Sequence, residues 1–91
     1  MTQSFERDVV IKNKLGIHAR PAAMLVQLSN KFRSEIFITK DSMSVSGKSI
    51  MGVMTLAASR GTKLKIKAVG EDAEEAVNKI ISLFEQKFGE K

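Results

Sequence analysis

The sequence contains no cysteine, tryptophan or tyrosine, and only one histidine and one proline among its 91 residues. Without cysteine, disulfide bonds and thiolate metal sites are excluded. With one histidine, a zinc site would have to be built from carboxylates, and none has a suitable spacing. The missing tryptophan and tyrosine argue against an RNA-binding sheet, because such sheets stack bases on aromatic side chains. We therefore expect no bound metal, no cofactor and no nucleic-acid partner.

Long apolar runs are absent as well. No segment approaches the ~20 apolar residues that a membrane-spanning helix needs. Residues 1–10 lack the basic region and apolar run of a signal peptide. We therefore expect a cytoplasmic protein without membrane insertion. A chain of 91 residues, 43% of them hydrophobic, can bury one modest core, which predicts a single domain over residues 1–91.

The charge is unbalanced, with a net +5 at pH 7. A positive net charge suits an acidic partner, which could be nucleic acid, a membrane surface or an acidic protein face. The basic residues are spread along the chain, and only Lys63, Lys65 and Lys67 form a pattern. Their strict alternation with apolar residues predicts the solvated face of a strand rather than a binding site.

Apolar periodicity predicts seven elements. Alternating apolar positions predict strands over residues 5–12, 34–40, 43–46 and 63–68. Helical spacing predicts helices over residues 19–31, 50–57 and 72–88. The order is βαββαβα. The polar outer faces favour an α+β fold, a two-layer open-faced sandwich in which a four-stranded, mainly antiparallel sheet carries three helices on one face.

Particular residues are expected to face the core. The inward stripe of the first helix is Ala22, Leu25, Val26 and Ser29. The last helix should bury Ala73, Ala76, Val77, Ile80, Ile81, Phe84 and Phe88, and Gly89 can terminate it. In the predicted hairpin, the apolar faces are Ile36 with Ile38 and Met43 with Val45.

The single histidine stands where a loop enters the first helix. Pro21 fits only in the first turn of a helix, so this helix must begin within a residue or two of His18. Unpaired N–H groups and the positive end of the helix dipole favour an anion there, and they favour the neutral, nucleophilic imidazole. Arg20 can donate hydrogen bonds to phosphate oxygens. A lone histidine near a helix start is more often a capping or surface residue, yet this set of residues could accept a phosphoryl group covalently.

Two segments carry a family resemblance. Residues 16–23, Gly-Ile-His-Ala-Arg-Pro-Ala-Ala, resemble the active-site signature of the histidine-containing phosphocarrier family, HPr, of the bacterial phosphotransferase system. Residues 47–57 resemble the second signature of that family, and the spacing, element order and length also agree. The resemblance implies that His18 is phosphorylated on Nδ1 and that Arg20 steadies the phosphoryl group.

The resemblance also implies partners. Phosphorylated enzyme I, itself charged by phosphoenolpyruvate, would be the donor, and a sugar-specific enzyme IIA would be the acceptor. The protein would then be a monomeric phosphocarrier and not an enzyme. Paralogues of a nitrogen-related phosphotransfer branch share the histidine signature, so that branch stays open. A regulatory variant that lacks the histidine is excluded because His18 is present.

Ser49 has two compatible interpretations. Its position predicts the N-cap of the short second helix. The resemblance matches it to a regulatory serine, which a dedicated HPr kinase/phosphorylase modifies in many bacteria. A phosphate there would add up to about two negative charges and would repel an acidic partner surface.

The second helix also predicts a docking surface. Such a short helix cannot bury every side, so we expect at least two of Ile50, Met51 and Met54 to be exposed. Flexible methionine side chains suit a surface that binds several partners. The resemblance places enzyme I and enzyme IIA on this patch together with Ile17, Ala23 and Met24.

Overall fold

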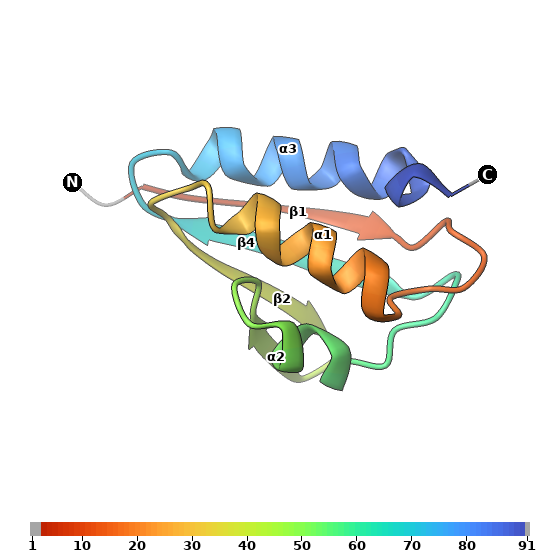
Figure 1. Ribbon diagram of the computed structural model, residues 1–91. Coiled ribbons are helices and arrows are strands. Elements are labelled where there is room, and N and C mark those ends of the chain that lie inside the picture. The colour runs from red at the N-terminus through yellow and green to blue at the C-terminus, as the bar shows by residue number, and fades with distance from the viewer. Residues whose placement is uncertain (1–2, 91) are drawn as a thin grey trace.

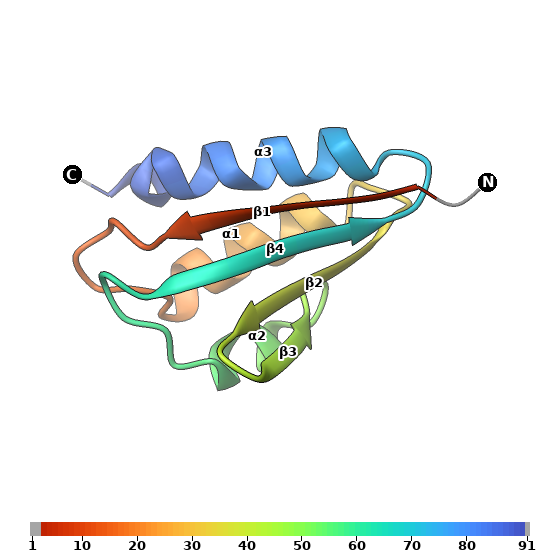
Figure 2. The same ribbon diagram turned by 180° about the vertical axis from the view of Figure 1, so that it is seen from behind.

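The computed structural model describes residues 3–90, in which four strands form one sheet. Strands β1 (Ser4–Val10), β2 (Glu35–Lys40), β3 (Met43–Ser46) and β4 (Lys63–Val69) lie in the order β1-β4-β2-β3, and every pairing is antiparallel. Helices α1 (Ala19–Ser29), α2 (Ile50–Thr55) and α3 (Ala73–Glu85) all cover the same face of this sheet (Figures 1 and 2). The predicted βαββαβα open sandwich is therefore confirmed. None of the helices between residues 3 and 90 is long and apolar enough to cross a membrane.

The two faces of the sheet are sorted by the alternation of the sequence. On β4, Leu64, Ile66 and Ala68 are at most 1% exposed and belong to the core. On the outer face, Lys65 Nζ lies 3.2 Å from a carboxylate oxygen of Glu6 on β1. Lys63 makes a similar pair with Asp8 on the same strand, at 3.4 Å. These exposed pairs are worth at most about 1 kcal/mol each, so they mark a solvated surface, as predicted.

The helices bury nearly all of the side chains predicted for their inner faces. Every predicted residue of α3 is buried, namely Ala73, Ala76, Val77, Ile80, Ile81 and Phe84. On α1, Ala22, Leu25 and Ser29 are buried, whereas Val26 is only partly buried. The predicted hairpin is confirmed by the pairing of β2 with β3, in which Val45 is partly buried and Met43 is 46% exposed. Met43 pairs with Lys40 at the turn end of the edge strand β3.

The ends of five elements differ from the prediction. β1, α1 and α2 each end two residues earlier, at Val10, Ser29 and Thr55, and β4 ends one residue later, at Val69. The last helix ends at Glu85 and is followed by a 3₁₀ turn, η1 (Lys87–Gly89), in which Lys87 and Phe88 have φ values of +57° and +53°. Residues in this conformation cannot continue a right-handed helix. The turn still buries Phe88, as predicted, with its ring centroid 4.9 Å from that of Phe84.

Asp72 ties the start of α3 to the connection between α1 and β2. Its carboxylate accepts hydrogen bonds from the backbone N–H groups of Arg33 and Ser34, each at 2.9 Å, and from the Ser34 hydroxyl at 2.5 Å. The Ser34 hydroxyl and the Arg33 N–H are the main reasons why the pKa of Asp72 falls to about 2. Gly70 allows this close approach, because a Cβ there would lie 2.5 Å from the Ser34 Oγ.

Replacing Asp72 with Asn should lower the free energy of unfolding at neutral pH, because a neutral amide is a weaker acceptor for these three donors. The folded-state pKa of about 2 lies below the ordinary 3.8. The contribution of the ionised Asp72 carboxylate to stability is therefore present above pH 3.8 and is lost as the pH falls towards 2. Urea denaturation at several pH values in this interval should show that the difference in free energy of unfolding between wild type and variant shrinks as the pH falls.

The matched control is Asp41→Asn. Asp41 is exposed and has a φ of +53°, which asparagine adopts readily. This variant should keep the stability of the wild type at every pH. Equal losses of stability in Asp72→Asn and Asp41→Asn would contradict a specific role for Asp72.

Candidate active site

His18 is the N-cap residue of α1. Its carbonyl oxygen accepts a hydrogen bond from the N–H of Ala22 at 3.0 Å, while its side chain makes no capping bond. The N–H groups of Ala19 and Arg20 have no acceptor within the helix, and Pro21 has no N–H to satisfy. The helix thus starts where the sequence predicted, and it presents free donors and the positive end of its dipole beside the imidazole.

The loop before His18 is pressed against the chain that follows α2. The N–H of Ile17 donates to the Ala58 carbonyl oxygen at 2.9 Å. Gly16 has a φ of +68°, and a Cβ at this position would lie 2.5 Å from the same oxygen. Asn13, which is fully buried, spans the loop by donating from Nδ2 to the Gly16 carbonyl at 2.6 Å. The backbone that carries His18 is therefore fixed from both sides.

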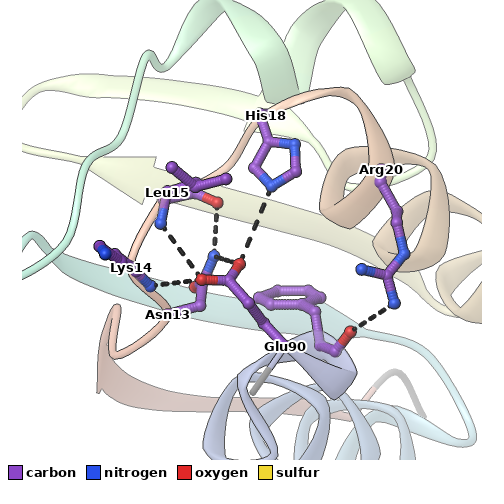
Figure 3. A network of polar contacts seen from close by, with 8 residues as sticks. Asn13, Lys14, Leu15, His18, Arg20 and Glu90 are labelled. Atoms are coloured by element: carbon purple, nitrogen blue, oxygen red, sulfur yellow. Dashed lines mark hydrogen bonds and ion pairs between the residues drawn. The ribbon is translucent and has the colours of Figure 1, made fainter.

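The two nitrogens of the His18 ring meet different surroundings. Nε2 is buried and has no hydrogen-bond partner, and Glu90 Oε2 lies 3.9 Å from it. The side chain as a whole is 38% exposed. Figure 3 shows Nδ1 on the other edge of the ring, turned away from Glu90. Nδ1 is consequently the nitrogen on the side from which a reacting group can approach.

Arg20 projects from the first turn of α1 beside the histidine (Figure 3). Its Nη2 donates to the carbonyl oxygen of Phe88 at 3.4 Å. This contact is at the long end of the hydrogen-bond range and uses one of the five guanidinium donors. The other donors are available to an anion bound at the helix start.

Glu90 closes the inner side of the site. Its carboxylate accepts hydrogen bonds from the N–H groups of Lys14 at 2.7 Å and Leu15 at 3.4 Å, and from Asn13 Nδ2 at 3.4 Å. Burial raises the pKa of Glu90, but these three donors and the charge of His18 together bring that pKa below its ordinary value. The ionised carboxylate therefore links the segment after η1 to the loop before His18.

Sequence reasoning misses Glu90 and the bracing role of Asn13. The local pattern identifies Asn13 only as a turn residue, and it assigns Glu90 no role. The contact between Glu90 and Lys14 joins residues 76 positions apart. No spacing rule within one element could have found it, because it depends on how the turn after α3 packs.

The expected apolar surface is present on α2. Ile50, Met51 and Met54 are 43%, 79% and 44% exposed, which confirms the prediction that at least two of them are exposed. Both ribbon views place α2 beside the start of α1, where His18 lies (Figures 1 and 2). The bond between Ile17 and Ala58 joins the same two regions.

The three docking residues predicted around His18 are less exposed. Ala23 and Met24 are partly buried on α1. Ile17 is only 6% exposed and belongs to the core cluster, so it offers little surface to a partner. Its side chain anchors the loop, while its neighbour His18 remains accessible.

Ser49 caps α2 as predicted. Its Oγ accepts a hydrogen bond from the Gly52 N–H at 3.0 Å, and its own backbone is extended. The residue is partly exposed. A modification of this hydroxyl would therefore change the charge at the start of the exposed α2 surface.

Comparison with known proteins agrees with this geometry. A family model described as the PTS HPr component phosphorylation site matches residues 5–86. The phosphocarrier protein HPr of Xylella fastidiosa strain 9a5c is 45% identical over 85 residues, which are 93% of this chain and 96% of the relative. The HPr-like protein Crh of Bacillus subtilis strain 168 is 43% identical over 81 residues, which are 89% of this chain and 95% of the relative.

Solved structures give the same result. The crystal structure of HPr-C-His from Thermoanaerobacter tengcongensis matches with a TM-score of 0.92 and 49% identity, covering 96% of this chain and 98% of that chain. An HPr dimer from the same organism matches with a TM-score of 0.77 and 51% identity, covering 90% of this chain and 94% of that chain. Fold and site thus define a carrier of the phosphotransferase system rather than an enzyme. The chain belongs to the HPr family of phosphocarrier proteins.

Replacing Gly16 with Ala should destabilise the protein for two reasons, the positive φ and the clash with the Ala58 carbonyl. Gly61→Ala is the matched control, because Gly61 has a φ of +88° but a Cβ at this position would meet no atom within 4 Å. We expect the control to cost about 1–2 kcal/mol from backbone strain alone. Gly16→Ala should cost roughly 1–3 kcal/mol more. Urea denaturation of both variants measures these losses of free energy of unfolding. Equal losses in the two variants would contradict the close contact between Gly16 and the Ala58 carbonyl.

Proposed function

We propose that His18 carries a phosphoryl group on Nδ1, which it receives from phosphorylated enzyme I and passes to an enzyme IIA in the sugar phosphotransferase system. The observation that supports this most directly is the placement of His18. Its Nδ1 is turned away from Glu90, beside a helix start with unpaired N–H donors and the guanidinium of Arg20. Such a carrier acts in the cytoplasm, where its two partners exchange phosphoryl groups.

The chemistry needs only positioning and charge stabilisation. The lone pair of Nδ1 attacks the phosphorus, a new N–P bond forms, and the bond between phosphorus and the donor nitrogen breaks with its electron pair returning to the donor. Proton transfer to or from Nδ1 is not required. The phosphoryl oxygens then lie near the N–H groups of the first helical turn and within reach of Arg20. Because the product stays at the surface, an acceptor histidine can remove it by the reverse attack.

Partner docking is assigned to the exposed face of α2 with the adjoining part of α1. Ile50, Met51 and Met54 supply apolar surface, and Ala23 with Met24 continue it towards His18. Flexible methionine side chains can adapt to partners of different shape. We propose that the protein acts as a monomer, although one HPr relative forms a dimer, because this face and His18 must both reach the partner.

Relatives of this chain include proteins called HPr and proteins called HPr-like protein Crh, so similarity alone does not separate the two roles. The presence of His18 in a site that can hold a phosphoryl group supports the carrier role. A nitrogen-related branch would use the same residues, and it is distinguished by which enzyme I serves as donor.

Incubation with phosphoenolpyruvate and purified enzyme I of the sugar system should add one phosphoryl group, which intact-mass spectrometry detects. The adduct should be acid-labile and absent from His18→Ala. A parallel reaction with the enzyme I of a nitrogen-related system tests the alternative branch, which a faster rate would favour. An adduct that persists in His18→Ala would contradict the proposal.

We further propose that phosphorylation of Ser49 regulates docking. The hydroxyl stands at the start of α2, whose exposed residues form the proposed docking face. A phosphate there would be tolerated by the helix end but would place about two negative charges against an acidic partner. An HPr kinase/phosphorylase in the host would be the modifying enzyme.

Two substitutions of Ser49 separate regulation from capping. Ser49→Asp keeps an N-cap acceptor, so it should preserve stability while slowing phosphoryl transfer from enzyme I about tenfold or more through like-charge repulsion. Ser49→Ala removes the acceptor for the Gly52 N–H. It should cost about 1 kcal/mol of stability but leave transfer fast. Unchanged transfer in Ser49→Asp would argue against the serine as a switch.

A further inference from the structure

Glu90 is the only acidic side chain that pairs with His18 within residues 3–90. Its Oε2 lies 3.9 Å from His18 Nε2, on the ring edge opposite Nδ1 (Figure 3). Nε2 is buried and has no hydrogen-bond partner. The buried edge of the ring therefore faces one carboxylate, and this arrangement is not explained by the capping or docking roles described above.

The carboxylate is held in place before any partner binds. The Lys14 and Leu15 N–H groups and the side chain of Asn13 all donate to it, so its orientation is fixed by three donors on the loop. On the other side, Phe88 is fully buried and anchors the turn that leads to Glu90. The position of Glu90 thus follows from core packing and from the same loop that carries His18.

We propose that Glu90 is a positioning residue for His18, holding the ring proton on Nε2 so that Nδ1 keeps the free lone pair. This inference rests on the proposed phosphoryl transfer. A carboxylate that faces one imidazole nitrogen sets the tautomer and the ring orientation, as in catalytic triads and in metal-bound histidines.

The same contact acts during the transfer step. When the Nδ1 lone pair forms the bond to phosphorus, the ring gains positive charge while its proton remains on Nε2. The negative charge of Glu90 stabilises that charged ring, and no proton has to leave. The bond from phosphorus to the donor breaks at the same time, with its electron pair going to the donor. Glu90 lies on the far edge of the ring, so it does not stand beside the negative phosphoryl oxygens.

The decisive comparison is Glu90→Gln against Glu85→Gln. Glutamine at position 90 keeps an oxygen that can accept from the Lys14 N–H but loses the charge that faces Nε2. Glu85 is an exposed residue of α3, so its substitution makes the same change in net charge away from the site. Amide chemical shifts of Lys14 and Leu15 report whether the loop is still held.

The first measurement needs no partner. Nitrogen-15 chemical shifts of the His18 ring at about pH 8.5, above the ordinary histidine range, give the ratio of the two neutral tautomers. We expect the proton mainly on Nε2 in the wild type. The ratio should fall about two- to fivefold in Glu90→Gln, the range for a partly exposed ion pair, and should not change in Glu85→Gln. An unchanged ratio in Glu90→Gln would overturn the proposal.

The second measurement is the rate of phosphorylation by enzyme I. In Glu90→Gln, kcat should fall by a similar two- to fivefold with KM unchanged, because the docking face is intact. A shifted tautomer ratio with an unchanged kcat, or a raised KM alone, would also overturn the proposal. If the wild type accepts no phosphoryl group although its tautomer ratio responds to Glu90→Gln, then the proposed function fails while the positioning of His18 stands.

Discussion

The packing of residues 13–18 against two distant parts of the chain determines the site. The Ile17 N–H bonds to the Ala58 carbonyl after α2, and the Lys14 N–H bonds to the Glu90 carboxylate after α3. Gly16 is needed because a Cβ at this position would collide with the backbone of Ala58 and Ser59. The loop therefore enters α1 in one orientation only, and this orientation sets where the imidazole points. Without these two attachments, the same residues would form an ordinary exposed loop before a helix.

The arrangement meets two opposing demands. A phosphocarrier must give up its phosphoryl group as readily as it accepts it, so the site cannot enclose the group as a deep pocket would. The structure meets this demand with a surface histidine, free N–H donors at the helix start and the guanidinium of Arg20. At the same time the ring must be oriented, and here the buried edge of His18 faces Glu90. The Nε2 edge of the ring faces Glu90, while the Nδ1 edge stays accessible to a partner.

Most of the fold could be predicted from the sequence, because apolar alternation and helical spacing are local properties of the chain. The same holds for His18 at the helix start and for Ser49 as an N-cap, since Pro21 and the capping preference act within a few residues. The parts that could not be predicted depend on long-range packing. The turn that buries Phe88 after the end of α3 breaks helical periodicity through two positive φ values. Glu90 reaches the site only because of that turn.

The proposed phosphoryl transfer depends on the Nδ1 edge of the His18 ring being the reactive one. Phosphorus–nitrogen coupling in the uniformly nitrogen-15-labelled, phosphorylated protein tests it most directly, because a one-bond coupling identifies the nitrogen that carries the phosphoryl group. The structure predicts coupling to His18 Nδ1, with a proton retained on Nε2 opposite Glu90. Coupling to Nε2 would contradict transfer at Nδ1, since Nε2 is the buried nitrogen.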